Sequence, residues 1–129
     1  MSEANLYKQL KSNWKFYIKR YETALIGAGL PDCQLVNDKQ REIWVELKYL
    51  PKAFVDKKLP IRDSQFIWFL EYKGKHAFLL FKIENELFLF KRSDIILLKN
   101  KIKYADFCKL ACLRSSKIKD VCEYLNICD

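Results

Sequence analysis

The chain has 129 residues, which corresponds to one ordinary domain, and half of the residues are hydrophobic. This composition excludes a disordered chain, and no apolar run is long enough to cross a bilayer. The net charge of +8, from 24 Lys and Arg against 16 Asp and Glu, favours polyanionic partners. The N-terminus lacks the features of a signal peptide, so we expect a cytoplasmic protein without a membrane partner.

The five cysteines are an odd number in a chain without a recognisable secretion signal, which indicates reduced thiols. Four lie in the last quarter of the chain: Cys108, Cys112, Cys122 and Cys128. Their spacing lacks the close pairs of a zinc ribbon. An iron–sulfur cluster is the alternative, but the apolar neighbours favour packing in the core.

The N-terminal part of the chain is predicted to form one helix and three strands. Ser2 caps the helix, which has an apolar face of Leu6, Leu10 and Trp14. A glycine-rich bend separates the first two strands, and a tight turn joins the second to the third. The strands are predicted at residues 15–23, 31–36 and 42–49.

The remaining chain is predicted to form a loop, a helix, a hairpin and further helices. The first elements are a lysine-rich loop at 51–61 and a helix that is capped by Asp63 or Ser64 and runs through Tyr72, with Phe66, Ile67, Phe69 and Leu70 as its apolar side. Strands at 76–83 and 86–92 and helices at 104–113 and 116–126 follow. The order α-β-β-β-α-β-β-α describes a mixed sheet flanked by helices. We expect a single domain over 1–129, with a core at about 3–92 and a helical extension at 93–129.

Two carboxylates and an amine are predicted to meet on neighbouring strands. Alternation along the strand at 42–49 sends Glu46 and Lys48 to one face, and antiparallel pairing through the turn brings Asp32 beside Glu46. The two carboxylates attract Mg²⁺, for which Mn²⁺ can substitute, and the backbone carbonyl of Leu47 is a further oxygen ligand. Lys48 is placed to hold or deprotonate a water, or to neutralise a phosphoryl group. The alternative is a solvated strand face with a same-side ion pair.

Three short segments carry a resemblance to a known family. Gly29-Leu30-Pro31-Asp32, Trp44-Val45-Glu46-Leu47-Lys48-Tyr49 and the helix start Asp63-Ser64-Gln65 resemble the motifs of the PD-(D/E)xK nuclease superfamily. Within it, the chain is most similar to small phage and archaeal-type Holliday junction resolvases and VRR-NUC proteins. The resemblance implies a restriction-endonuclease-like α/β fold and hydrolysis of DNA phosphodiesters, usually by a homodimer. It also suggests a phage origin, in which case the protein acts in the host cytoplasm.

The resemblance also implies further site residues. In such proteins a glutamate of the first helix joins the metal site, which corresponds to Glu3. A glutamate just before the glycine-rich bend is also common, and Glu22 fits that position; the choice between the two stays open. Gln65 corresponds to a helix glutamine that supports the site or contacts the phosphate.

Basic residues around the motif are candidates for contact with DNA phosphates. Lys52, Lys57, Lys58 and Arg62 lie between the Glu46 strand and the Gln65 helix, and Lys19 and Arg20 are weaker candidates. A mobile loop kept soluble by its charge is the alternative. We therefore expect a Mg²⁺-dependent endonuclease that acts on branched DNA. The alternatives are a nuclease of flap, nicked or linear DNA, or a nucleic-acid-binding module that does not cleave.

Overall fold

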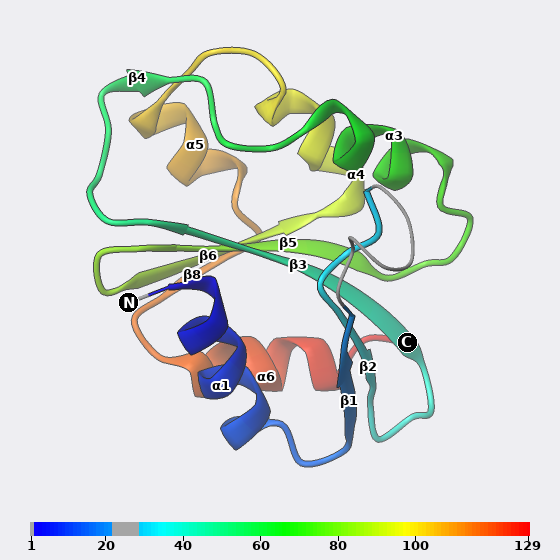
Figure 1. The fold of residues 1–129 in the computed structure, drawn as a ribbon. Coiled ribbons are helices and arrows are strands. Elements are labelled where there is room, and N and C mark those ends of the chain that lie inside the picture. Colours follow the sequence, from blue (N-terminus) through cyan, green and yellow to red (C-terminus); the bar gives the residue numbers. More distant parts are fainter. Residues whose placement is uncertain (1, 22–28) are drawn as a thin grey trace.

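The computed structural model describes residues 2–21 and 29–129, which form a six-stranded sheet between two layers of helices (Figure 1). The strand order is β1-β2-β3-β5-β6-β8. Within this sheet β3 and β5 run parallel and the other neighbours run antiparallel. The strands are β1 Tyr17–Arg20, β2 Cys33–Val36, β3 Glu42–Leu50, β5 Ala77–Ile83, β6 Glu86–Lys91 and β8 Leu113–Ser115.

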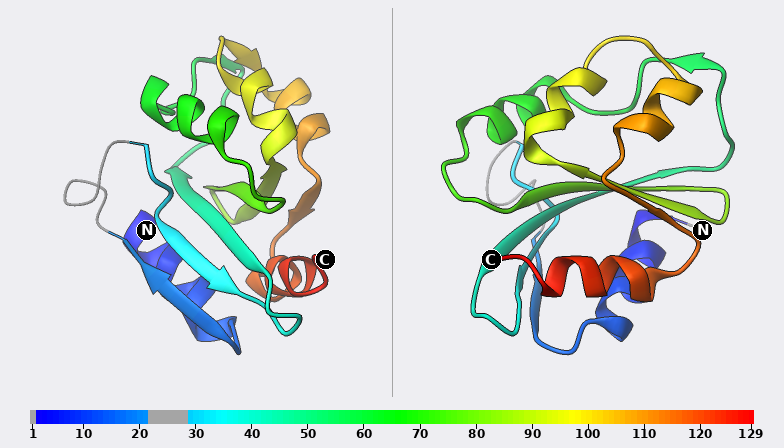
Figure 2. Two further views of the ribbon diagram at one scale, coloured as in Figure 1. Left: turned by 90° about the vertical axis from the view of Figure 1, so that its right-hand side faces the viewer. Right: turned by 180° about the vertical axis from the view of Figure 1, so that it is seen from behind.

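Each face of the sheet is covered by its own set of helices, as both views in Figure 2 show. One face packs against α1 Glu3–Asn13 and α6 Ile118–Asn126. The other packs against α3 Asp63–Glu71, α4 Arg92–Ile95 with the following 3-10 turn Ile96–Leu98, and α5 Tyr104–Leu110. A separate two-stranded sheet pairs β4 Asp56–Lys57 with β7 Ile102–Lys103. The parallel β3–α3–β5 unit therefore places α3 over the face of β3 that carries Glu46.

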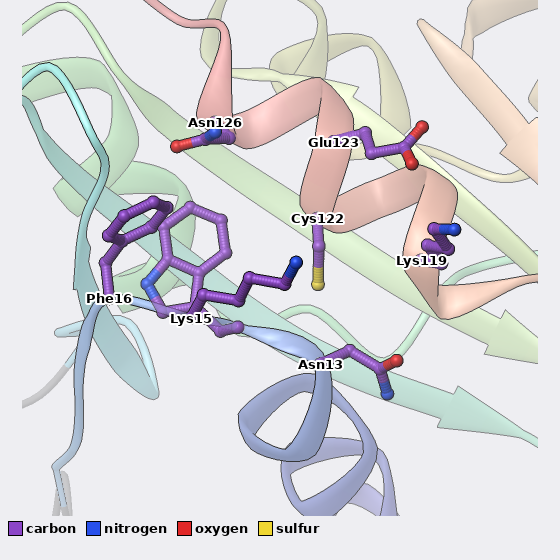
Figure 3. A pocket seen from close by; sticks show the side chains of 8 residues that line it. Asn13, Lys15, Phe16, Lys119, Cys122, Glu123 and Asn126 are labelled. Carbon is purple, nitrogen blue, oxygen red and sulfur yellow. The ribbon is translucent and has the colours of Figure 1, made fainter.

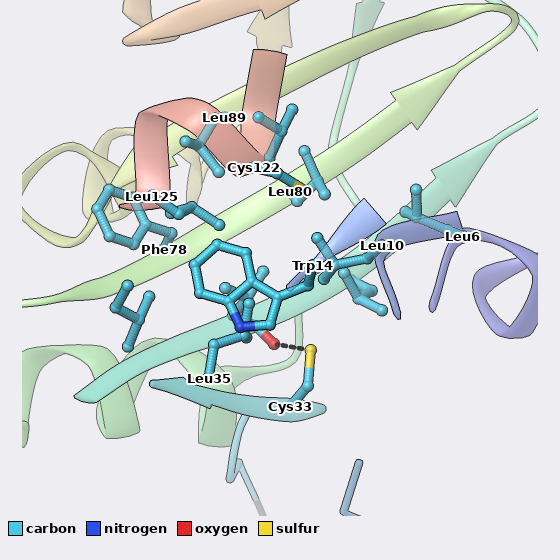
Figure 4. Close-up of a cluster of buried hydrophobic side chains, with 14 of the residues drawn as sticks. Leu6, Leu10, Trp14, Cys33, Leu35, Phe78, Leu80, Leu89, Cys122 and Leu125 are labelled. Atoms are coloured by element: carbon cyan, nitrogen blue, oxygen red, sulfur yellow. Dashed lines mark hydrogen bonds between the residues drawn. The ribbon is translucent and has the colours of Figure 1, made fainter. Parts of the chain in front are cut away.

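The layer under α1 and α6 confirms the predicted first helix. The Ser2 hydroxyl accepts a hydrogen bond from the Asn5 N–H at 3.2 Å, as an N-cap should. Leu6 and Leu10 are fully buried, and Figure 4 shows them beside Trp14 and the side chains of α6. Burial of this apolar face fixes α1 against the sheet.

The tight turn between β2 and β3 is held by one asparagine. Asn37 Oδ1 accepts hydrogen bonds from the N–H groups of Lys39 and Arg41, both at 3.0 Å. Its amide nitrogen donates to the carbonyls of Leu125 and Cys128, which ties the turn to the end of α6. Gln40 adopts the left-handed conformation, with φ of 61°. The predicted turn is confirmed, and it sets the register of the two strands.

Several predicted details of the fold were wrong. The C-terminal segment is not purely helical, because Leu113–Ser115 pairs with β6 as the edge strand β8. The helix after the loop takes Arg62 as its N-cap, in place of Asp63 or Ser64. Its side chains Ile67 and Leu70, predicted to be buried, are 52% and 60% exposed.

All five cysteines are free thiols; Cys33 and Cys122 are buried and the other three are half-buried. In the described part of the chain no helix has the length and apolar character needed to cross a bilayer.

Candidate active site

The register of β2 against β3 brings the two predicted carboxylates together. Cys33 pairs with Val45, so the residue before Cys33 lies opposite the residue after Val45. The N–H of Asp32 donates to Glu46 Oε1 at 3.2 Å, and Asp32 Oδ2 accepts from the N–H of Leu47 at 2.8 Å. The prediction that Asp32 comes beside Glu46 through the turn is therefore confirmed.

Glu46 is a buried carboxyl group with an unusual charge environment. It is 2% exposed, although it lies in the middle of a sheet of strong β-formers. The pKa of Glu46 is raised to about 8, first by burial and then by the charge of Asp32, and the charge of Lys48 opposes this rise. Two carboxylates held together in a poorly solvated place form a site that favours a cation.

Gln65 connects α3 to this carboxylate. Its Nε2 donates to Glu46 Oε2 at 2.8 Å, and its Oε1 accepts from the N–H of Arg62 at 3.0 Å. The side chain is 2% exposed. Gln65 therefore satisfies a backbone donor at the start of α3 and orients Glu46 at the same time.

Gly29 allows the segment before Asp32 to approach α3 closely. It has a φ of +86°, a conformation that side chains with a Cβ rarely adopt. A Cβ at this position would lie 2.2 Å from the carbonyl oxygen of Ser64. The glycine is therefore required on both conformational and steric grounds, and it helps to bring Asp32 beneath the first turn that carries Gln65.

Lys48 completes the group on this face of β3. Its Nζ lies 3.5 Å from Glu46 Oε2, and the side chain is 10% exposed. The predicted alternative, a solvated strand face, is wrong, because Glu46 and Lys48 are both buried. A buried ammonium beside a carboxylate is an ion pair whose partners depend on each other.

Glu3, at the start of α1, lies within electrostatic reach of the group. Burial raises the pKa of Glu3, Lys48 lowers it and Asp32 raises it. The charges of Arg20 and Arg62 also lower it. Arg20 pairs with Cys33, the residue after Asp32, and the N–H of Arg62 donates to Gln65, so both residues lie beside the carboxylates. Glu22, the other glutamate candidate, lies outside the described residues.

The oxygen atoms around Asp32 and Glu46 are of the kind that a divalent cation needs. Asp32 and Glu46 provide carboxylate oxygens, which Mg²⁺ and Mn²⁺ prefer. The Leu47 carbonyl points to the same edge as its N–H, which binds Asp32. Over residues 2–21 and 29–129 no group of three His, Cys, Asp or Glu side chains is close enough to hold a metal. The residues therefore fit an ion held by two carboxylates that keeps several waters.

The predicted DNA-contacting residues fall into two groups. Arg62 and Arg20 border the carboxylates, and Lys19 lies next to Arg20 in β1 with its Nζ 5.1 Å from the ring centre of Tyr21. Lys57 is in β4, which Figures 1 and 2 place across the upper layer from α3. Lys52 and Lys58 are exposed in the same loop. Contact of this second group with DNA stays a prediction.

Trp44 packs against α3. Its ring lies 5.8 Å from that of Trp68 in α3, at 64°, and 5.5 Å from that of Tyr21.

A pocket on the opposite face of the sheet is lined by Asn13, Cys122 and Asn126 among others (Figure 3). Asn13 ends α1 and Glu3 begins it, so about 16 Å of helix separates this pocket from Glu3.

Fold and site together define a mixed α/β domain of the restriction-endonuclease-like class, with Asp32, Glu46 and Lys48 at the junction of β2 and β3. The chain is similar in structure to a Holliday junction resolvase of the archaeal hyperthermophile Archaeoglobus fulgidus, with a TM-score of 0.55 and 14% identity. The similarity covers 94% of each chain. No protein-family model and no curated protein sequence matches the chain. The predicted fold class is confirmed, and the resemblance is confirmed at the level of the fold.

The structural similarity reaches further along the chain than the sequence motifs do. The resemblance in sequence covers roughly residues 3–92, whereas a match to 94% of the chain must include most of the C-terminal segment. That segment supplies β8 to the sheet and α6 to its lower face. It is therefore part of the shared architecture.

Proposed function

We propose that the chain is a metal-dependent endonuclease that hydrolyses DNA phosphodiesters, acts on branched DNA such as a four-way junction, and works as a homodimer. One observation carries the proposal. Asp32 and Glu46 are hydrogen-bonded side by side, with Lys48 3.5 Å from Glu46, on a fold shared with a Holliday junction resolvase.

The chain's own residues have distinct parts in this proposal. Asp32 and Glu46 hold the divalent ion, with the Leu47 carbonyl as a further oxygen and Glu3 or Glu22 as a more distant acidic partner. Gln65 keeps Glu46 oriented through its 2.8 Å hydrogen bond. Lys48 orients a water or neutralises charge that develops on the phosphoryl group. The ion, Mg²⁺ or Mn²⁺, supplies polarisation of the scissile phosphate.

DNA as the partner is supported by charge as well as by the fold. The net charge is +8, and Arg20 and Arg62 border the carboxylates. Guanidinium groups bind phosphate oxygens in a bidentate manner, so these two residues are suited to phosphates that flank the cut.

The test compares substrates and variants in one assay. The protein is incubated with a four-way junction, a flap, a linear duplex and a single strand, each with Mg²⁺ or with EDTA. Asp32→Asn and Lys48→Ala are the site variants. Asp38→Asn and Lys99→Ala are their matched controls, because both residues are exposed and outside the site. We expect Mg²⁺-dependent symmetric nicks in the junction, lost in the site variants and retained in the controls.

Other outcomes would select an alternative. Preferential cutting of the flap or the linear duplex would keep the enzyme and change the substrate. DNA binding without cutting in Mg²⁺ or Mn²⁺ would favour a binding module of the same fold. Unchanged cutting in Asp32→Asn would refute the site. Light scattering of the free protein tests the homodimer.

A further inference from the structure

A second pocket lies at the end of the sheet where β5 begins and β6 ends. Its volume is about 420 Å³, and its basic lining residues are Lys75, His76, Lys91 and Arg92. The hydroxyl-bearing residues Ser93 and Tyr124 also line it, and no carboxylate does so within the described chain. A hollow with this lining is suited to an anion.

Strand pairing brings these residues together from two separate segments. Phe78 of β5 pairs with Lys91 of β6, so the residues before Phe78 and after Lys91 meet at one edge. Arg92 is held there because its Nη1 donates to the carbonyls of Phe69 and Tyr72, at 3.1 and 2.5 Å. Among residues 2–21 and 29–129 those bonds use one nitrogen of the guanidinium group, so Nε and Nη2 are left for a ligand.

His76 carries an unsatisfied group at this pocket. Its Nε2 is buried and has no hydrogen-bond partner in the described part of the chain, and its ring stacks on Phe78 at 10°. Buried polar atoms without partners are uncommon in folded proteins. Burial lowers the pKa of His76; Asp129 opposes this, and the charges of Lys75 and Arg41 add to it.

Two acidic side chains lie in an adjoining hollow. Glu42 and Asp129 line that hollow together with Arg41, Lys75 and His76. Asp129 already forms an ion pair with Lys39 at 2.5 Å. The positive charges that line the pocket at Lys91 and Arg92 are therefore not neutralised by Asp129.

We propose that this pocket binds a phosphoryl group, and that the group is a backbone phosphodiester of the bound DNA away from the bond that is cut. The assignment to DNA rests on the proposed function. In the β3–β5 ladder Ala77 lies opposite Trp44 and Leu79 opposite Glu46. The start of β5 is thus about 7 Å along the strand direction from the level of Glu46, and the pocket lies further across the sheet, beside Tyr124 of α6. DNA carries phosphates along its whole length, so one molecule that passes over this end of the sheet can present a phosphate to each place.

The experiment uses Asp32→Asn as a background that binds DNA without cutting it. In this background Lys75→Ala and Lys91→Ala are combined, and the control combines Lys11→Ala with Lys109→Ala, which removes the same charge from exposed lysines elsewhere. We expect the pocket variant to bind the four-way junction about tenfold more weakly, with a log–log salt slope smaller by about one to two, whereas the control stays within about twofold of the background.

The single histidine of the chain provides a second readout that does not depend on cutting. We expect the junction DNA to shift the NMR signals of the His76 ring, and the pocket variant to lose this shift. Inorganic phosphate serves as the other probe. A response to phosphate but not to DNA would overturn the assignment to DNA and indicate a free phosphate ligand. Equal DNA binding by the pocket and control variants would overturn it as well. Failure of the wild type to cut DNA, with the His76 response retained, would refute the nuclease and leave the pocket standing.

Discussion

The two faces of β3 carry opposite kinds of buried side chain. On one face Ile43, Val45 and Leu47 are at most 1% exposed and pack in the layer with α1 and α6. On the other face Glu46 and Lys48 are 2% and 8% exposed and form an ion pair. Burial of apolar side chains stabilises a fold, whereas burial of charges is unfavourable unless they are closely paired.

This difference separates the residues that stabilise the domain from those that depend on it. The apolar face of β3 is stabilised by packing against its neighbours alone. On the polar face Asp32 and burial together raise the pKa of Glu46 to about 8, so the carboxylates are held together against their repulsion. Such a local conflict is expected at functional sites, where the rest of the fold compensates for it.

The largest effect is expected from Asp32→Asn. This substitution keeps the size of the side chain and removes one of the two charges that we propose to hold the metal. We expect Mg²⁺-dependent cutting to fall by about 10³-fold or more, because the polarisation of the phosphate is lost. The free energy of unfolding should stay equal or rise, because the pKa of Glu46 returns toward its usual value. Initial cutting rates and urea denaturation measure the two quantities.

Ile43→Ala tests the apolar face of β3. Ile43 is fully buried, so this substitution leaves a cavity and should lower the free energy of unfolding by about 3 kcal/mol. Cutting per folded molecule should change less than about threefold, because the side chain points away from Glu46. Urea denaturation gives the stability, and the cutting assay is run at 15 °C to keep the variant folded. A loss of cutting as large as that of Asp32→Asn would show that the two faces are not separable.

The part of the site that the sequence predicted comes from local patterns. Alternation of side chains along β3 determines the face of Glu46 and Lys48, and a short turn determines the register that brings Asp32 beside them. Both rules act over a few residues. For that reason the pair was predictable, and Gln65 followed from the family resemblance.

The parts that were missed depend on contacts distant in sequence. The strand Leu113–Ser115 forms because β6 has a free edge, and nothing within the segment signals it. The basic pocket joins Lys75 and His76 to Lys91 and Arg92, which are brought together by the pairing of β5 with β6. His76 could not be assigned to this pocket from the sequence, because a single histidine in a sequence carries no information about its neighbours.

A smaller effect is expected from pH in the absence of metal. The pKa of Glu46 is about 8 in the folded protein and near 4.5 when the chain is unfolded. Between these values the folded state binds more protons than the unfolded state, so its stability is greatest below pH 4.5 and falls as the pH rises toward 8. We expect a loss on the order of 2 kcal/mol in EDTA from this group. Thermal denaturation from pH 5 to 9 measures it.

Metal provides the control for that prediction. Mg²⁺ favours the ionised carboxylates, so it should raise the melting temperature more at pH 8 than at pH 6. Asp32→Asn should remove most of this dependence on metal. A melting temperature that responds equally to Mg²⁺ at both values would contradict the raised pKa of Glu46.

The smallest effect, and the most specific test of the polar face, is expected from Gln65→Leu. Glu46 Oε2 would lose its 2.8 Å donor and the N–H of Arg62 would lose its acceptor. The pKa of Glu46 should rise further, because a hydrogen bond to the ionised form is removed. We expect cutting to fall about tenfold at pH 7 and to recover in part at pH 9 or at high Mg²⁺.

Gln9→Leu is the matched control for this substitution. It removes a similar side-chain hydrogen bond, from the buried Lys82 to Gln9 at 3.2 Å, which lies outside the carboxylate group. This control should lower stability by about 1 kcal/mol without a shift in the pH profile of cutting. If Gln65→Leu lowered cutting equally at every pH, Gln65 would act on the phosphate and not through Glu46. The shape of the pH profile therefore distinguishes the two roles that the resemblance left open.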